Sequence, residues 1–212
     1  MAGSYDFEEQ ERLAELKAWW EDNRWYVIGA AAAAILAFAG YHGWVHWRER
    51  QAEDAAAMYR PVAEAAKGQD PKKVQEAARP LIDKHSGSFY ASEAALMSAK
   101  AAFEAANYAE ARKQLEWVLD KGADIHKGVA RMRLAAVHLE EKRYDEALRV
   151  LDGNRDEAFA ALAAHVRGDV MLAQGRIDEA RAAYKLAIDK AELRNPVKQL
   201  AETKLNALGG AQ

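Results

Sequence analysis

Residues 165–188 read HVRGDVMLAQGRIDEARAAYKLAI and contain the clearest structural pattern in the chain. Two runs of helix-forming residues are separated by Gly175, which predicts a turn between two helices. Gly168 lies in the first run, and the second run places small and large apolar residues three and four positions apart. Small residues allow two helices to approach closely, while large side chains fill the space beside them. This stretch therefore predicts a helical hairpin.

The second half of the hairpin has two counterparts upstream. The three segments are YAEARKQL from Tyr108, YDEALRVL from Tyr144 and IDEARAAY from Ile177, with starts 36 and 33 residues apart. A period of about 34 residues with this spacing of small and large residues is typical of tetratricopeptide repeats. The signature positions are Tyr108, Ala111 and Leu115 in the first repeat, Tyr144, Ala147 and Leu151 in the second, and Gly168, Gly175, Ile177, Ala180, Tyr184 and Ala187 in the third.

Some positions depart from a regular repeat. Arg131, His138 and Arg167 stand where the pattern has apolar core residues. Asn154 stands where the second repeat should have alanine. We therefore predict that the second helix of this repeat ends early, at Asp152.

The chain after residue 47 is rich in Ala, Leu, Glu, Lys and Arg and shows no sustained alternation of polar and apolar residues, which predicts helices only. A degenerate helix pair precedes the repeats, with Val74, Ala77 and Leu81 on its second helix. A last helix would cap the apolar end of the array. The predicted segments are the degenerate pair at 52–86, repeats at about 89–121, 126–153 and 156–190, and a capping helix at 196–208.

The segment from Trp25 to Trp47, WYVIGAAAAAILAFAGYHGWVHW, contains 23 residues and no Asp, Glu, Lys or Arg, in a chain that is 30% charged. A helix of this length measures about 34 Å, and the hydrocarbon core of a bilayer is about 30 Å thick. Tryptophan and tyrosine occur at both ends, as they do at membrane interfaces. The fold class is therefore all-α: a single N-terminal transmembrane helix over 25–47, followed over 48–212 by a tetratricopeptide-like, right-handed stack of helical hairpins.

Two further interpretations concern this span. Gly29, Ala33, Ala37 and Gly40 lie along one side of it and would let a second helix pack closely, although an Ala-rich anchor without a partner has the same composition. A cleaved signal peptide is the alternative to an anchor, because a small-x-small site precedes Gly40. The 24 residues before the span carry three basic and seven acidic side chains, however, whereas a signal peptide begins with a positive region. The basic residues on the two sides are too balanced to predict the orientation.

Residues 1–24 are acidic, and Asp6 to Asp22 is predicted to form a short amphipathic helix. Asp6 would cap it with Glu9 three residues on, and Leu13, Leu16 and Trp20 would share one face. The acidic face disfavours contact with anionic lipid headgroups. The helix is interpreted as a solvated segment, with a protein-docking helix as the alternative.

Composition excludes several classes of function. The formal net charge of −3 and the lack of a dense Lys/Arg cluster argue against nucleic acid as a partner. The chain has no cysteine, which removes disulfides, thiolate metal sites and cysteine nucleophiles. It also contains no phosphate-binding loop, dinucleotide-binding motif or hydrolase motif. We therefore predict that it is not an enzyme and has no catalytic residues and no cofactor.

Two kinds of polar pair have simple structural explanations. His42 and His46 lie four residues apart on one helix face, but two ligands make a weak metal site, and their interfacial position explains them without a metal. The pairs Asp145-Glu146 and Asp178-Glu179 stand in the first turns of predicted helices, where carboxylates interact favourably with the helix dipole. No metal site is predicted.

The first helices of tetratricopeptide hairpins line a concave groove, and an apolar groove suits an apolar peptide or a partner helix. If the register is shifted by one residue, several of its side chains belong to the core instead. The predicted groove residues are Leu96, Phe103, Met132, Leu139, His165 and Leu172.

The carboxylate clamp known from tetratricopeptide proteins is absent from the sequence. Its lysine positions hold Leu96, Met132 and His165, and its asparagine positions hold Lys100, Ala136 and Asp169. Binding of a C-terminal carboxylate through such a clamp is therefore not predicted.

The combination of segments resembles the YfgM family: the acidic N-terminal helix, the span ending in GYHGWVHWRERQ, and the repeats RLAAVHLEEKRYDEALRVLD and HVRGDVMLAQGRIDEARAAYKLAI. The match covers nearly the whole chain. The resemblance implies a single-pass protein of the bacterial inner membrane with residues 1–24 in the cytoplasm and 48–212 in the periplasm. It also implies an ancillary subunit of the SecYEG translocon that pairs with the periplasmic chaperone PpiD.

The leading hypothesis is a non-enzymatic scaffold: the span docks beside the translocon, and the groove holds a chaperone or an emerging chain. The alternative is a membrane-anchored regulator whose cytoplasmic segment binds a signalling protein. Deletion of residues 2–22 separates the two hypotheses.

Overall fold

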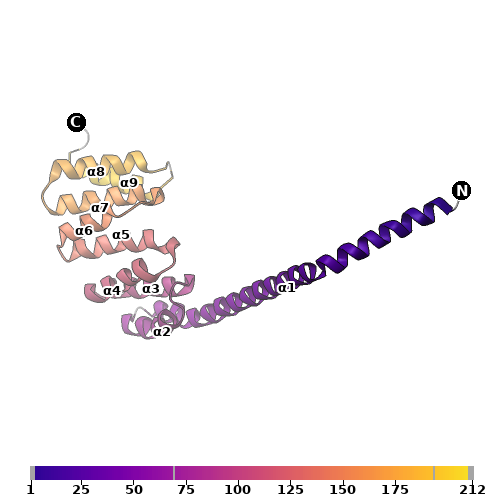
Figure 1. Cartoon of the computed structure of the whole chain (residues 1–212). Helices are drawn as coiled ribbons and strands as arrows, with labels where there is room; N and C mark the ends of the chain where they lie inside the picture. The colour runs from indigo at the N-terminus through magenta and orange to yellow at the C-terminus, as the bar shows by residue number, and fades with distance from the viewer. Residues whose placement is uncertain (1–2, 69, 193, 210–212) are drawn as a thin grey trace. The chain divides into compact units, whose positions relative to one another are not determined.

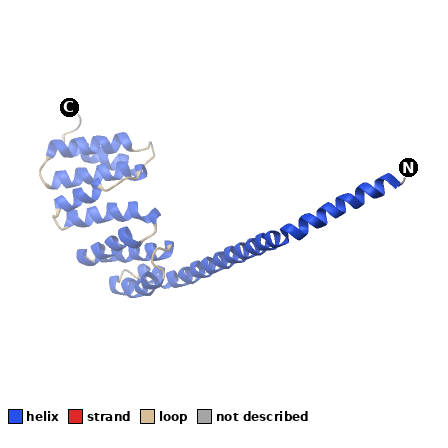
Figure 2. Ribbon diagram, in the orientation of Figure 1, coloured by secondary structure: helices blue, strands red, loops and turns tan. Residues whose placement is uncertain are grey.

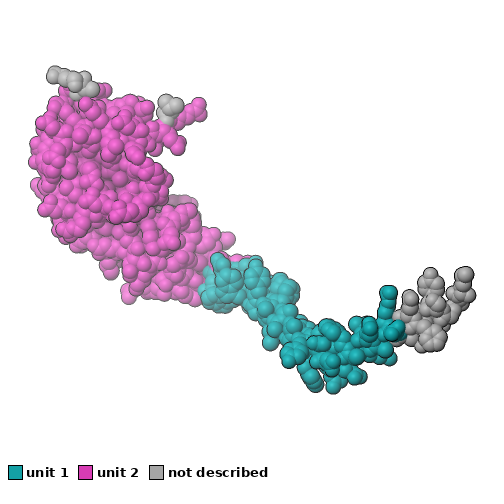
Figure 3. Space-filling view, turned by 45° about the horizontal axis from the view of Figure 1, so that its top comes forward, with its two compact units in different colours: residues 1–51 teal, residues 52–212 magenta. Residues whose placement is uncertain are grey.

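The computed structural model describes residues 3–68, 70–192 and 194–209, with side chains from residue 11 onward. The regular elements in these ranges are all helical (Figures 1 and 2). The chain divides into two compact units, residues 1–51 and 52–212 (Figure 3). The helices are α1 (Gly3–Lys67), α2 (Pro71–Lys84), α3 (Phe89–Glu104), α4 (Tyr108–Lys121), α5 (Asp124–Glu140), α6 (Tyr144–Asp152), the short 3₁₀ helix η1 (Glu157–Phe159), α7 (Ala160–Ala173), α8 (Ile177–Lys190) and α9 (Pro196–Ala207).

The first unit contains the N-terminal part of α1 and includes the predicted span. Its large apolar side chains are not covered by the chain: Ile35 is 67% exposed, Leu36 72% and Phe38 67%. Contact with lipid hydrocarbon would remove this apolar surface from water. Among the described residues, α1 is the one helix that is long and apolar enough to cross a membrane.

The bounds of α1 differ from those predicted for a short N-terminal helix. It begins at Gly3, so the predicted helix start at Asp6 is wrong. The side chains of the predicted capping residues Asp6 and Glu9 lie outside the described residues. At its other end α1 continues to Lys67: residues 44–60 contain no glycine or proline, and Pro61 lies inside the helix without ending it.

Side-chain caps define the starts of several helices in the second unit. The Asp70 carboxylate accepts a hydrogen bond from the backbone N–H of Lys72 at 3.0 Å and starts α2. Ser88, Asn107 and Asn195 cap α3, α4 and α9 in the same way. These polar residues satisfy backbone donors that have no partner inside the helix.

Three hairpin turns share an unusual backbone conformation. Ala106, Lys142 and Gly175 have φ values of 55°, 59° and 76°, in the left-handed region. They occupy corresponding places, each being the middle residue of the turn between the first and second helix of a hairpin. Only the third turn uses glycine, which adopts this conformation without the steric cost that a side chain brings.

Small and large signature residues meet inside each hairpin. A Cβ atom on Gly168 would lie 2.6 Å from Cδ1 of Tyr184, so the aromatic ring packs directly against the backbone of α7. The corresponding pairs are Ala135 with Leu151 and Ala99 with Leu115, and each pair shares one core cluster. All four of these side chains are at most 2% exposed. The third repeat therefore fills this space with a glycine–tyrosine pair, and the other two repeats fill it with an alanine–leucine pair.

The core of the second unit is a series of clusters that join consecutive hairpins. The first cluster includes Val62 of α1 with Leu81 of α2, and the next includes Leu115 of α4 with Val137 of α5. In the last cluster, Leu205 of α9 packs with helices α7 and α8. Each hairpin thus buries its apolar face against its neighbours, and α9 covers the final one.

The irregular positions of the pattern are accommodated individually. Helix α6 ends at Asp152, the predicted position, and Asp152 Oδ1 lies 2.6 Å from a guanidinium nitrogen of Arg167. His138 is 5% exposed, with its Nδ1 3.9 Å from Oε2 of Glu141. Arg131 is half-buried beside Gly153. Ile177 is 38% exposed, which makes it the least buried of the large signature residues in its repeat.

Candidate functional site

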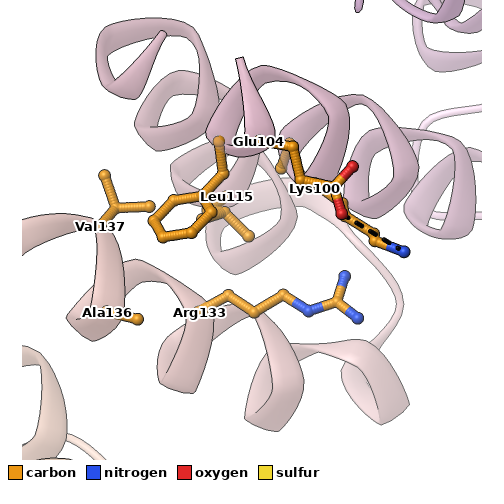
Figure 4. A pocket seen from close by; sticks show the side chains of 8 residues that line it. Lys100, Glu104, Leu115, Arg133, Ala136 and Val137 are labelled. Carbon is orange, nitrogen blue, oxygen red and sulfur yellow. Dashed lines mark ion pairs between the residues drawn. The ribbon is translucent and has the colours of Figure 1, made fainter. Parts of the chain in front are cut away.

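A pocket of about 330 Å³ opens between α3 and α5, the first helices of two neighbouring hairpins (Figure 4). Its floor contains Ala99, Leu115 and Val137, which are 2%, 1% and 1% exposed. Half-buried Phe103 and Ala136 complete the apolar lining. The volume lies at the lower end of the range of ligand pockets, about 300–1,000 Å³.

Charged side chains form one rim of this pocket. Lys100 Nζ lies 3.7 Å from Oε1 of Glu104, and both side chains are exposed. Arg133 is also exposed, and its Nη1 donates to the carbonyl oxygen of Leu96 at 3.3 Å. Among the described residues, no carboxylate oxygen lies within 4.0 Å of the Arg133 guanidinium. Figure 4 shows the charged ends of Lys100 and Arg133 on the same side of the pocket, away from Val137.

Helical periodicity places these groups together. Lys100, Phe103 and Glu104 are spaced i, i+3 and i+4 on α3, and Arg133, Ala136 and Val137 have the same spacing on α5. Residues at this spacing share one helix face. Two equivalent faces of neighbouring hairpins therefore meet across the pocket.

The predicted groove residues divide into two groups. Leu96, Met132 and His165 are 3%, 4% and 8% exposed, so little of their surface is open to a partner. Phe103, Leu139 and Leu172 are half-buried. Of the six, Phe103 lines the pocket.

The positions compared with the carboxylate clamp have other roles in the structure. Lys100 and Ala136 line the pocket. Asp169 accepts hydrogen bonds from the Tyr184 hydroxyl at 2.7 Å and from Lys204 Nζ at 3.0 Å. This carboxylate joins α7, α8 and α9 and does not line the pocket.

Four of the histidines are buried beside carboxylates. Nε2 of His85 lies 3.2 Å from Asp54 Oδ2, and Nε2 of His126 lies 2.8 Å from Glu93 Oε1. His138 and His165 have their nearest carboxylates at 3.9 Å and 3.6 Å. Burial lowers the pKa of His138 and of His165, because a desolvated imidazole disfavours its charged form.

The remaining polar candidates show structural pairings. A hydrogen bond from Arg143 lowers the pKa of Glu146, and one from Arg176 lowers the pKa of Glu179. Both carboxylates stand in the first turn of a helix, as do their neighbours Asp145 and Asp178. His46 Nδ1 lies 3.4 Å from Glu49 Oε2, and the described residues contain no group of three side chains arranged to hold a metal ion.

The small residues of the span lie on an open surface. Gly29, Ala33, Ala37 and Gly40 are all exposed. Among the described residues, no atom outside the adjacent residues and the local helix backbone lies within 4 Å of a Cβ placed on Gly29 or Gly40. Their role in packing against a second helix remains a proposal.

Sequence reasoning did not identify most residues of the pocket. Arg133 and Val137 have no role predicted from sequence, and Lys100 and Ala136 appear there only as clamp positions that lack asparagine. The i, i+3, i+4 pattern on both helices was available as a signal. Its importance depends on α3 and α5 being neighbours, which is a tertiary relation.

Comparisons with known proteins identify the relatives of the chain. The family described as "Tetratricopeptide repeat-like domain" matches residues 17–210. The "Ancillary SecYEG translocon subunit" of Neisseria gonorrhoeae is 30% identical over 203 residues, which cover 95% of this chain and 97% of that protein. Proteins of the same name from Aggregatibacter actinomycetemcomitans and Escherichia coli are 29% and 27% identical, with 97% and 84% of this chain and 100% and 87% of those proteins covered.

Solved structures support the fold independently. The chain "MamA 41-end from Desulfovibrio magneticus RS-1" has a TM-score of 0.54 at 19% identity, with 74% of this chain and 94% of that chain covered. At this identity the likeness concerns the fold alone. The family match over residues 17–210 and the nearly full-length sequence matches show that the chain belongs to the tetratricopeptide-like family of the ancillary SecYEG translocon subunits, the family that its sequence resembles.

Proposed function

We propose that the protein is a non-catalytic scaffold of the inner membrane and an ancillary subunit of the SecYEG translocon. The observation that carries this proposal is the similarity over nearly the whole length to relatives of that name, including the N-terminal span. The exposed apolar surface of α1 supports membrane insertion. The exposed small residues of the span are proposed as the face that packs against a translocon helix.

The proposed orientation places residues 1–24 in the cytoplasm and residues 48–212 in the periplasm, as the family resemblance implies. The chain has no cysteine, so single cysteines can report on it. Ser86→Cys and Glu15→Cys introduce a thiol at exposed positions after and before the span. In spheroplasts, a membrane-impermeant thiol reagent should label the first variant and not the second. The reverse result would overturn the orientation.

The proposed role of the second unit is to bind a partner protein near the translocon exit, either a PpiD-like chaperone or an emerging chain. The pocket between α3 and α5 supports this role, because its apolar floor and charged rim resemble sites that bind peptide segments. The repeat array presents this pocket on the first helices of its hairpins, where tetratricopeptide proteins bind extended ligands.

Purification of the full chain in mild detergent, followed by identification of co-purifying proteins, tests the proposal. Recovery of SecYEG components and a membrane-anchored chaperone is the expected result. Recovery of neither would contradict the proposal. A variant without residues 2–22 should retain these partners, whereas a regulator that acts through its cytoplasmic segment would lose its signalling partner and keep the translocon.

A further inference from the structure

The pocket between α3 and α5 combines an apolar floor with one cation, Arg133, that has no ionic partner among the described residues. Leu115 and Val137 are both 1% exposed, so the floor offers apolar contact and no polar group to a ligand. A bulky apolar side chain that enters the pocket removes its own surface and the exposed edge of Phe103 from water. Removing this apolar surface from water favours the complex.

The rim is electrostatically asymmetric. The Lys100 ammonium is already paired with Glu104, at 3.7 Å. Arg133 has no carboxylate partner among the described residues, and its one hydrogen bond there goes to the Leu96 carbonyl. A guanidinium has five N–H donors, which leaves most of them available for a planar carboxylate. Glu104 would repel an acidic group placed beside Lys100, so the favourable position for a carboxylate is beside Arg133.

A second cavity in the same unit does not have this property. It has a volume of about 360 Å³ and is lined by residues of α2 and α4, including Arg79, Asp83 and Lys113. Arg79 pairs with Asp83 at 3.8 Å, and Lys113 pairs with Glu110 at 3.9 Å. Both of its cations are therefore paired with carboxylates, and the described lining residues offer no unpaired charge to a ligand.

We propose that the pocket between α3 and α5 binds a segment of a partner protein in which a bulky apolar residue is adjacent to Asp or Glu. The apolar side chain packs on Phe103 and Leu115, and the carboxylate forms an ion pair with Arg133. The proposal rests on the partner-binding role proposed above and specifies its chemistry. It needs no chain terminus, because the carboxylate belongs to a side chain.

Short labelled peptides test this chemistry on the full chain in nanodiscs of neutral lipid, with empty nanodiscs as the control for lipid binding. Three peptides share an Ala/Ser background and contain Phe-Asp, Phe-Lys or Ala-Asp at the centre. Dissociation constants are measured by fluorescence anisotropy. We expect the Phe-Asp peptide to bind most tightly, and each of the others to bind roughly tenfold more weakly, the size of one charge-assisted hydrogen bond or one buried side chain.

Reversing the charge of Arg133 gives the decisive test of the proposed ion pair. Arg133→Glu should weaken the Phe-Asp peptide by roughly tenfold and make Phe-Lys the preferred peptide. A misfolded variant would lose both peptides, so a reversed preference requires an intact pocket. Arg149→Glu is the matched control: Arg149 is exposed on α6, forms no ion pair with the described residues and does not line the pocket, so the preference should stay unchanged.

Equal binding of the Phe-Asp and Phe-Lys peptides to the unchanged chain would overturn the inference, as would a preference that Arg133→Glu leaves intact. The same preparations are assayed for co-purifying translocon components. A chain that retains these components but shows no peptide preference overturns the pocket chemistry alone. A chain that shows the preference but recovers no translocon component supports the pocket chemistry and contradicts the proposed translocon role.

Discussion

The second and third hairpins follow the same sequence pattern but differ in length. Helix α6 has nine residues, whereas α8 has 14. Ala187 is fully buried in α8, and the corresponding residue of the second hairpin is Asn154, which lies beyond the end of α6. The Asn154 amide instead donates to the Asp156 carbonyl oxygen at 3.0 Å. A polar residue at a core position therefore ended the helix, because burial without a partner is costly and the turn satisfied its side chain.

The two hairpins also differ in how their helices touch. In the third, glycine faces tyrosine, with Gly168 against the Tyr184 ring, whereas in the second Ala135 shares a core cluster with Leu151. A larger side chain on one helix is matched by a smaller one on the other. The summed side-chain volume of the pair is therefore similar in the two hairpins, as a close-packed core requires.

Removing the large side chain of each pair, Tyr184 or Leu151, should have the largest effect on stability. Tyr184→Ala should lower the local free energy of unfolding by about 4 kcal/mol, and Leu151→Ala by about 3 kcal/mol, because each leaves a cavity of different size. Hydrogen exchange of amides in α7–α8 and α5–α6, measured on the full chain in detergent, reports the two effects separately. Tyr184→Phe is the control that keeps the ring, and it should cost about 1 kcal/mol through loss of the bond to Asp169. Equal losses in Tyr184→Ala and Tyr184→Phe would show that packing is not the main term.

Adding one methyl group to Gly168, the small residue of the third hairpin's pair, should have the next largest effect on stability. Gly168→Ala favours an isolated helix by about 1 kcal/mol, but here the new Cβ meets the Tyr184 ring, so a net loss of about 2 kcal/mol is expected. The double variant Gly168→Ala with Tyr184→Leu recreates the alanine–leucine pair of the second hairpin. It should be more stable than the sum of the single variants predicts. Strict additivity in hydrogen exchange would contradict the size-matching explanation.

Substitutions in the hairpin turns should have smaller effects on stability. Lys142→Gly should stabilise the second hairpin by about 1 kcal/mol, and Gly175→Ala should destabilise the third by about the same amount, because both residues have positive φ. Exchange rates of the flanking helices measure both effects. Gly68→Ala serves as the control, since Gly68 is not among the residues with positive φ and a Cβ on it would make only an ordinary contact, 3.5 Å from the Ala65 carbonyl oxygen. A stabilising Gly175→Ala substitution would show that backbone strain at this place is not limiting.

The pH dependence that arises from one buried histidine, His165, should be the smallest effect on stability. The neighbouring Asp169 carboxylate partly offsets the cost of charging the imidazole ring. Burial lowers the folded-state pKa of His165, Lys204 of α9 lowers it further, and Asp169 raises it. The other ionisable group beside the ring is Tyr184 of α8, whose pKa is raised by burial. The unfolded chain therefore takes up a proton first, so the contribution of His165 to stability is present above about pH 6.5 and is lost as the pH falls toward the folded-state pKa.

Urea unfolding at about pH 7.5 and at about pH 5.5 measures this dependence. His165→Gln should reduce the loss of stability in acid, and His46→Gln, which changes an exposed histidine, should not. An unchanged pH dependence in His165→Gln would show that other groups control the acid response.

Much of the helical architecture could be predicted from residues that lie close together in the sequence. The repeat spacing and the turn residues predicted the hairpins, and Asn154 correctly predicted the end of α6 at Asp152. The start of α1 was predicted wrongly at Asp6, because Asp is a preferred capping residue, whereas the helix begins at Gly3. The site was harder: Leu96 and Met132 were predicted to line a groove, whereas the structure places both in the core. Leu96 lies four residues before Lys100, and Met132 lies four residues before Ala136, so core and pocket residues share one side of each helix and periodicity alone does not separate them.

Helix type, repeat register and the apolar span follow from the chain alone, because each depends on residues a few positions apart. The pocket depends on residues 99–104 of α3 meeting residues 133–137 of α5 above Leu115 of α4. Arg133 has no carboxylate partner among the described residues, and this depends on which side chains lie near it after folding. Packing between hairpins determines both, since distances and ionic partners between separate helices exist only once the array has formed.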